Sequence, residues 1–232
     1  MKIALVGGTG DIGTGFAVRW AANHEIIIGS RKAEKAAEAV KAVQHILQQP
    51  VPGQSVPDFG LLERIAGTDN GSAIAGADVV VLCVPFENLQ SVTADLRDSY
   101  SGQIVISPVV PMSYNGKVFQ FTPPAQGSAA LLARSLLPDK TKVVSAFHTI
   151  AAASLQNRAR ELKGDAFLCG DDPDALNTVA GLASEIKNLR PLKLGPLETS
   201  ALAESLTPML LNVARKNKIK DAGISIVSER SA

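Results

Sequence analysis

The chain has 232 residues, enough for one large domain or for a standard domain with a smaller one. It is 46% hydrophobic and 19% charged, which excludes a disordered protein, and its net charge of +1 gives no electrostatic case for a nucleic-acid or membrane partner. Two separated cysteines and three scattered histidines exclude a disulfide scaffold and predict no metal site. No membrane-length apolar run and no leader pattern is present, so we expect a cytoplasmic protein.

The first half of the chain alternates between short apolar runs and helical spacing. Strands are predicted at residues 3–6, 25–28, 62–67, 78–84 and 103–106, and helices between them at residues 11–22, 32–47, 70–76 and 86–96. This alternation is typical of a parallel sheet with helices on both faces. Residues 48–60 interrupt it with several prolines and glycines, which predicts a loop or flap.

The second half begins after a rigid segment at residues 108–111. Helices are predicted at residues 128–136, 173–186 and 197–218, and strands at residues 142–147, 166–169 and 190–194. Pro208 predicts a kink or a split in the last helix, whose apolar face predicts a core or dimer contact. We predict a Rossmann-type domain over residues 1–140 and a smaller α/β domain over residues 141–232.

A glycine fingerprint follows the first predicted strand directly and opens the first predicted helix. The residues Gly8, Thr9, Gly10, Asp11, Ile12 and Gly13 match G-x-G-x-x-G in the required context. Gly8 permits the tight turn, Gly10 lets the backbone approach a pyrophosphate, and Gly13 lets helix and strand pack closely. The helix N-terminus then attracts phosphates, so this motif predicts a dinucleotide site rather than an ordinary glycine-rich turn.

The end of the second strand indicates which dinucleotide is bound. An NAD site usually has Asp or Glu there, whereas this chain has Ser30 and Arg31, with Lys35 one helical turn further on. A guanidinium and an ammonium predict a 2′-phosphate pocket and therefore NADP; the alternative is a solvated helix start. Val84 and Pro85 end a strand at the expected switch point, beside the nicotinamide ribose or in ordinary strand-end packing.

Acid–base machinery is sparse in this sequence. There is no Tyr-x-x-x-Lys pattern, and His148 has no orienting partner nearby in the sequence. Hydride exchange between two planar cofactors needs orientation rather than a proton relay. Cys83 and Cys169 fall in predicted buried strands, and Asp172 before a proline predicts a helix N-cap rather than a metal ligand.

Several segments, in order along nearly the whole chain, resemble the family of NADPH-dependent reductases of coenzyme F420. They are Gly7 to Gly13, Gly29-Ser30-Arg31, Ser107 to Pro111, Val144 to Ile150, Cys169 to Asp172, Leu189 to Leu192, Gly195 to Leu197 and Glu204 to Pro208. The resemblance implies a Rossmann domain with a small C-terminal domain, and a hydride passed in the cleft between NADP and the deazaflavin F420. It also implies a homodimer.

The same resemblance implies where the deazaflavin lies. Its side of the cleft is formed by Pro108, Val109, Val110, Pro111, Thr149, Ile150, Ala151, Leu206, Thr207 and Pro208, with His148 positioning the ring. Two features depart from the family pattern: Ala151 stands where the family commonly has proline, and residues 48–60 look like an insertion. Alternative functions are NADPH-dependent reduction of a flavin, quinone, carbonyl or imine, and a non-catalytic NADPH sensor.

Overall fold

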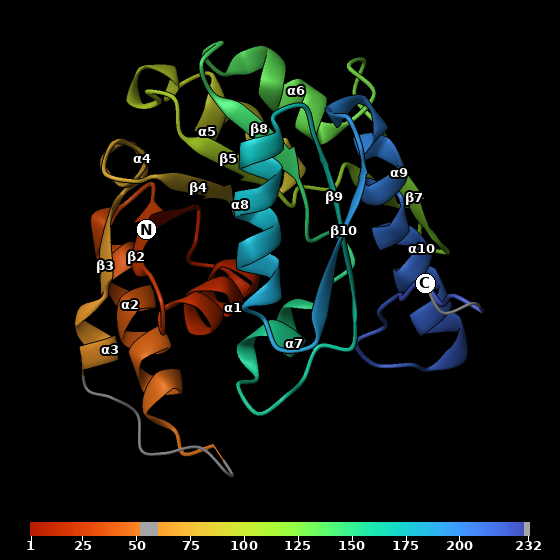
Figure 1. Cartoon of the computed structure of the whole chain (residues 1–232), viewed down its shortest axis with the longest axis horizontal. Helices are drawn as coiled ribbons and strands as arrows, with labels where there is room; N and C mark the ends of the chain where they lie inside the picture. The colour runs from red at the N-terminus through yellow and green to blue at the C-terminus, as the bar shows by residue number, and fades with distance from the viewer. Residues whose placement is uncertain (52–59, 230–232) are drawn as a thin grey trace.

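The computed structural model describes residues 1–51 and 60–229 of the chain. These residues form an eight-stranded sheet in the order β10-β9-β8-β5-β4-β1-β2-β3, flanked by helices (Figure 1). Its strands are β1 Lys2–Val6, β2 Glu25–Ser30, β3 Ile65–Asp69, β4 Val79–Leu82, β5 Ile104–Ser107, β8 Lys142–Ser145, β9 Gly164–Gly170 and β10 Leu189–Gly195. Neighbours are parallel except β8 and β9, so β9 and β10 run against the others.

Helices connect these strands in the described part of the chain. They are α1 Asp11–Trp20, α2 Ala33–Gln48, α3 Gly60–Glu63, α4 Asn70–Ala75, α5 Leu89–Thr93, α6 Ala129–Leu136, α7 Ala152–Gln156, α8 Pro173–Ser184, α9 Ser200–Glu204 and α10 Leu206–Asn217. The order β3-β2-β1-β4-β5-β8 is that of a doubly wound dinucleotide-binding sheet. The predicted Rossmann-type α/β class is therefore confirmed. Residues 52–59, most of the predicted proline-rich loop, lie outside the described residues.

Two hydrophobic cores lie on the two faces of the sheet. Successive residues of β1 alternate between them, since Leu5 belongs to one core and Val6 to the other. The first core also contains Phe16 of α1, which stacks on Trp20 at 4.6 Å between ring centroids. Helices α1, α2 and α8 contribute to this core, and α4, α5 and α6 to the second. Burial on both faces explains why the strands are continuous apolar runs in the sequence.

The C-terminal part of the chain extends the same sheet. Ser145 of β8 lies opposite Ser107 of β5, so the predicted boundary at residue 140 falls between two neighbouring strands. Helix α7 packs on α1, where Arg19 Nε donates to Leu155 O at 2.8 Å. Trp20 Nε1 also donates to Leu182 O at 2.9 Å. These contacts fix residues of the C-terminal part directly against the first helix of the chain.

The predicted last helix is split in two. A 3-10 turn, Leu197–Thr199, precedes α9, and α10 follows after Ser205. The break lies three residues before Pro208 because proline has no N–H to bond the carbonyl of Glu204, one turn earlier. The predicted apolar face is largely outside the core, since Leu202 is 62% exposed and Met209 is 42% exposed.

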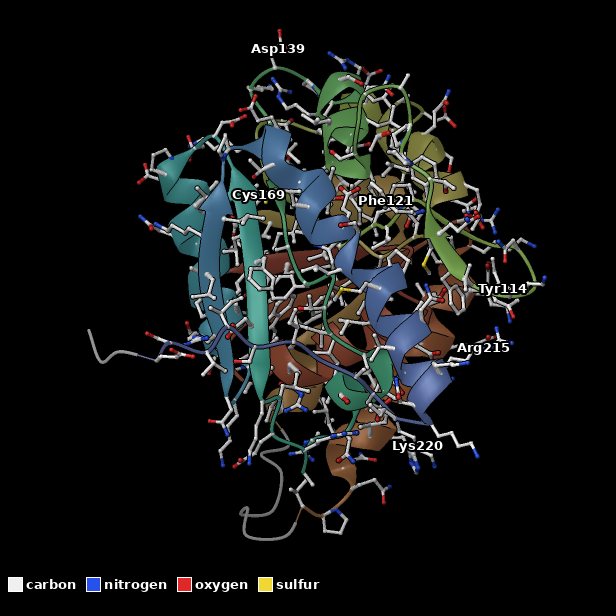
Figure 2. All side chains as sticks on the ribbon, turned by 90° about the vertical axis from the view of Figure 1, so that its right-hand side faces the viewer. Tyr114, Phe121, Asp139, Cys169, Arg215 and Lys220 are labelled. Atoms are coloured by element: carbon white, nitrogen blue, oxygen red, sulfur yellow. The ribbon has the colours of Figure 1, made fainter. Side chains whose placement is uncertain are left out.

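A β-hairpin that the sequence patterns did not predict lies against α10. Its strands are β6 Met112–Tyr114 and β7 Phe119–Phe121. Asn212 of α10 donates to and accepts from the backbone of Phe119, both at 2.8 Å. The Arg215 guanidinium lies over the ring of Tyr114, 4.9 Å from its centroid (Figure 2). No helix in the described residues is long and apolar enough to cross a membrane.

Candidate functional site

A cavity of about 640 Å³ opens at the carboxyl ends of β1, β2 and β4. It is lined by Gly7, Thr9, Gly10, Ser30, Arg31, Lys32, Lys35, Asn70, Cys83, Val84, Pro85, Asn88, Ser91 and Val92. The structure thus brings together the predicted cofactor residues Thr9, Gly10, Ser30, Arg31, Lys35, Val84 and Pro85 around one space. Gly8, Asp11, Ile12 and Gly13 lie in the turn and helix behind this lining.

The glycines of the turn differ in what they make room for. A Cβ on Gly13 would lie 2.4 Å from the carbonyl oxygen of Gly8, and one on Gly7 would lie 2.3 Å from Val84 Cγ1. These two glycines are therefore required by the packing of the chain itself. A Cβ on Gly10 would have nothing within 4 Å. Gly10 faces open space in the cavity, which fits the close approach of a phosphate to the backbone.

Helices α1 and α2 begin at the cavity without a side-chain cap. Their N-cap residues, Gly10 and Lys32, accept no capping hydrogen bond, a feature shared with α5, α7, α9 and α10, so it is their place at the cavity that distinguishes α1 and α2. An uncapped N-terminus has amide groups without intrahelical partners and the positive end of the helix dipole. Both features fit the phosphates of a dinucleotide.

The polar groups at the end of β2 suit a phosphate better than a neutral ribose. Ser30 is 8% exposed and accepts from Lys32 N at 3.4 Å, while Arg31 is exposed at the cavity. Lys35 also lines the cavity, and its ammonium pairs with Glu38 at 2.7 Å. The nearby acidic residue, Asp69, lies opposite Ser30 on β3.

The carboxylate of Asp69 has a structural role, because it caps the N-terminus of α4. It accepts from Ser72 N at 2.9 Å at the start of α4, and hydrogen bonds from the side chain and the backbone of Ser72 lower the pKa of Asp69. An acid committed to capping α4 is a poor partner for a ribose 2′-hydroxyl. The basic character of this pocket therefore agrees with the NADP preference predicted from Ser30 and Arg31.

Asn70 is a site residue that the sequence patterns did not single out. Its Oδ1 accepts from Gly7 N at 3.1 Å, and its side chain is 6% exposed at the cavity. Gly7 has φ of +68°, so this hydrogen bond supports the left-handed turn that precedes the fingerprint. The signal was an asparagine directly after a strand, but its partner lies 63 positions away in the sequence.

His148 lies in a buried polar group beyond the ends of β5 and β8. It is 6% exposed, and its Nε2 is 3.5 Å from Ser145 Oγ. Burial lowers the pKa of His148 to about 4, so the imidazole is neutral at neutral pH. His148 Nδ1 and Ser107 Oγ have no hydrogen-bond partner within the described ranges, although both atoms are buried. Such atoms fit a ligand or water that brings polar groups of its own.

Two segments of the predicted deazaflavin side are in contact. Thr207 Oγ1, at the start of α10, donates to the carbonyl of His148 at 2.7 Å. Residues 108–111 follow β5 directly, and Val109 is 3% exposed in the second core. Thr149, Ile150 and Ala151 line a second cavity of about 230 Å³, separate from the larger one. The assignment of F420 to these residues stays a prediction.

Sheet order, glycine turn and uncapped helices together define a Rossmann-type dinucleotide-binding protein. Residues 2–111 match the family described as coenzyme F420-dependent NADP oxidoreductase. The chain is 38% identical to the F420-dependent NADP reductase of Methanocaldococcus jannaschii, over 98% of this chain and 99% of that protein. It is 37% identical to that of Methanothermobacter thermautotrophicus, over 98% of this chain and 95% of that protein.

A solved structure from Arthrobacter sp. FB24, described as a candidate F420-dependent NADP reductase, has the same fold. It is 22% identical, with a TM-score of 0.78, and the match covers 98% of this chain and 100% of that one. The curated relatives match at higher identity over nearly their whole length. This chain belongs to the family of coenzyme F420-dependent NADP oxidoreductases.

Proposed function

We infer that this chain is an F420-dependent NADP reductase, which transfers a hydride between NADP(H) and the deazaflavin coenzyme F420. The observation that carries this inference is the end-to-end match to reductases of that name. The cavity independently supports the NADP part of this inference, because an open Gly10, two uncapped helices and the Arg31 side chain fit a phosphorylated dinucleotide.

We propose that the chain holds NADP through three features. The N-terminal amides of α1 bind the pyrophosphate, and Ser30, Arg31 and Lys35 bind the 2′-phosphate. Val84 and Pro85, after β4, lie beside the nicotinamide ribose. When both are bound, NADPH supplies the hydride and F420 accepts it, or the reverse.

We propose that the deazaflavin side orients the ring of F420 and excludes water from it. Residues 108–111, 149–151 and 206–208 border the ring in this proposal, and residues 141–232 close the cleft. Neutral His148 donates a hydrogen bond to a ring carbonyl and transfers no proton, which its low pKa supports. Two rings held at reacting distance need no proton relay.

A direct assay tests the proposed reaction. Purified protein is mixed with NADPH and oxidised F420, and the loss of deazaflavin absorbance is followed, with FMN as the parallel acceptor and NADH as the parallel donor. We expect rapid bleaching of F420 with NADPH and little with NADH or FMN. Turnover of FMN, a quinone or a carbonyl without F420 turnover would instead indicate a different reductase, and NADPH binding without any turnover would indicate a sensor.

We also propose that the chain forms a homodimer, as its family resemblance implies. Met209 and Val213 are four residues apart and lie on one side of α10, where they are 42% and 44% exposed, and Leu202 of the preceding helix α9 is 62% exposed. Apolar side chains grouped on one surface favour burial against a second copy. Light scattering after gel filtration tests this, and a monomer at all concentrations would exclude it.

A cytoplasmic location is the last part of the proposal. Cys83 and Cys169 are both free thiols and both buried. Unpaired cysteines are the usual state in a reducing compartment. Fractionation of the source cell with antibodies against the chain tests this location.

A further inference from the structure

A carboxylate at the end of α9 is completely buried and connects two distant parts of the chain. Glu204 is 0% exposed. Its Oε2 accepts from Ala129 N at 2.9 Å and its Oε1 accepts from Ala130 N at 3.1 Å, at the start of α6. These partners are 75 and 74 positions earlier in the sequence. Both oxygens are therefore used in a single contact between α9 and α6.

Helix α6 already has a cap of its own. Ser128 Oγ accepts from Leu131 N at 3.0 Å, in the usual geometry of a serine N-cap. Glu204 adds acceptors for the two amides before that one, and its charge interacts favourably with the helix dipole. Burial nevertheless opposes the charged form and raises the pKa of Glu204 to about 7. A buried carboxylate is an unfavourable way to stabilise a helix that has its own cap.

The contact of Glu204 fixes the start of α10, not only the end of α9. One residue separates the two helices, and Thr207 of α10 donates to the carbonyl of His148 at 2.7 Å. Leu206 packs against a small apolar cluster that contains Cys169 of β9 and Ala203 of α9. The α9–α10 junction, residues 204–207, is thus held from two directions, by α6 and by the segment after β8.

We propose that Glu204 is a positioning residue for the deazaflavin side of the cleft. Its bond to α6 sets the position of the α9–α10 junction and therefore the contact between Thr207 and His148. This inference rests on the proposed function in one respect, that residues 206–208 and His148 border F420. The NADP cavity contains no residue of α6, α9 or α10 in its lining, so Glu204 acts on one cofactor and not on the other.

Two variants separate positioning from simple helix stability. Glu204→Gln keeps the size of the side chain but replaces one acceptor by an amide group that repels a backbone N–H. Ser128→Ala removes the other cap of the same helix and leaves Glu204 in place. Kinetics with F420 and NADPH, the NADPH dissociation constant without F420, and the melting temperature are measured for both variants.

We expect Glu204→Gln to raise the KM for F420 about tenfold, because a shifted junction misplaces the ring, while NADPH binding stays within about twofold. Ser128→Ala lowers the melting temperature without changing the KM for F420. An unchanged F420 KM in Glu204→Gln would overturn the proposal, and so would an equal rise in Ser128→Ala.

Hydrogen exchange makes the result independent of F420 turnover. If the wild-type protein does not turn over F420, the proposed function is wrong. The effect of Glu204 on the α9–α10 junction can still be measured, because amide exchange needs no F420. We expect Glu204→Gln to speed exchange in residues 146–151 and 206–210, and Ser128→Ala to speed it only in α6. If Glu204→Gln does not fold, Thr207→Val loosens the same junction from its other end. The proposal is overturned if amide exchange in residues 146–151 is unchanged in Glu204→Gln or, where that variant does not fold, in Thr207→Val.

Discussion

The two sides of the proposed cleft are built in different ways. The NADP side is an open cavity whose lining residues come from two stretches, residues 7–35 and residues 83–92, together with Asn70. The proposed deazaflavin side takes residues 108–111, 148–151 and 206–208, which are far apart in the sequence and partly buried, and a hydrogen bond from Thr207 to His148 links the last two segments. The first side depends on local backbone geometry, and the second depends on long-range contacts that hold separate segments together.

We expect the largest effect on stability from a substitution in the glycine turn of the NADP side. Gly13→Ala places a Cβ 2.4 Å from a backbone oxygen, so we expect a loss of roughly 3 kcal/mol in the free energy of unfolding, at the top of the range for overpacking. Gly10→Ala has nothing within 4 Å to clash with, so its stability stays unchanged while its affinity for NADPH falls. Denaturant unfolding and NADPH titration of both variants measure this. A stable Gly13→Ala variant would refute the packing argument.

The pH dependence of stability tests the role of Glu204, which holds together the deazaflavin side. The pKa of Glu204 is about 7 in the folded chain, above its ordinary value of 4.5, so the folded chain binds this proton more tightly. Its contribution to stability is therefore present below pH 4.5 and is lost as the pH rises through 7, by at most roughly 3 kcal/mol. Glu204→Gln removes this dependence. Urea unfolding at pH 5 and at pH 8 measures it, and parallel pH profiles for both proteins would contradict it.

Arg31 tests whether the NADP side reads the 2′-phosphate. Arg31→Ala removes charge-assisted hydrogen bonds of about 2 kcal/mol, so we expect the KM for NADPH to rise roughly 30-fold. The KM for F420 and the kinetics with NADH stay unchanged, because neither ligand contacts the guanidinium in this account. Equal losses with NADPH and NADH would remove the 2′-phosphate assignment.

Lys35 gives the smallest expected effect of the series. Its ammonium is exposed and already pairs with Glu38 at 2.7 Å, so it contributes a screened point charge. We expect Lys35→Ala to raise the KM for NADPH about threefold, which is less than the effect of Arg31→Ala. The difference in KM between Lys35→Ala and the wild-type protein shrinks at high salt. A salt-independent loss as large as that of Arg31→Ala would show that Lys35 contacts the phosphate directly.

Several residues that the sequence predicts for NADP line one cavity in the structure, because the signals that predict them are local. The run before Gly7, the fingerprint and the basic strand end at Arg31 follow one another within a single βαβ unit, so spacing alone placed them together. Asn70 escaped prediction because its role depends on Gly7, 63 positions away. The division at residue 140 stays a prediction, although β5 and β8 pair across it.

The deazaflavin side had no local signal, so only family resemblance placed it. Nothing in the spacing indicates that Thr207 meets His148 or that Glu204 meets Ala129. The β6–β7 hairpin was missed because its strands have three residues each and lie among prolines. Pro208 correctly predicted a break, and the missing proline N–H explains why the break falls earlier, at Ser205.

If the two bound rings exchange a hydride directly, an isotope at the donor carbon must appear in the acceptor. NADPH carrying deuterium at both hydrogen positions of the reactive nicotinamide carbon is used to reduce F420 in ordinary water with this protein, and the reduced F420 is analysed by mass spectrometry. We expect the reduced F420 to contain one deuterium from NADPH. Reduced F420 that contains only solvent hydrogen would contradict direct transfer and would require an intermediate carrier or a proton-exchanging group in the site.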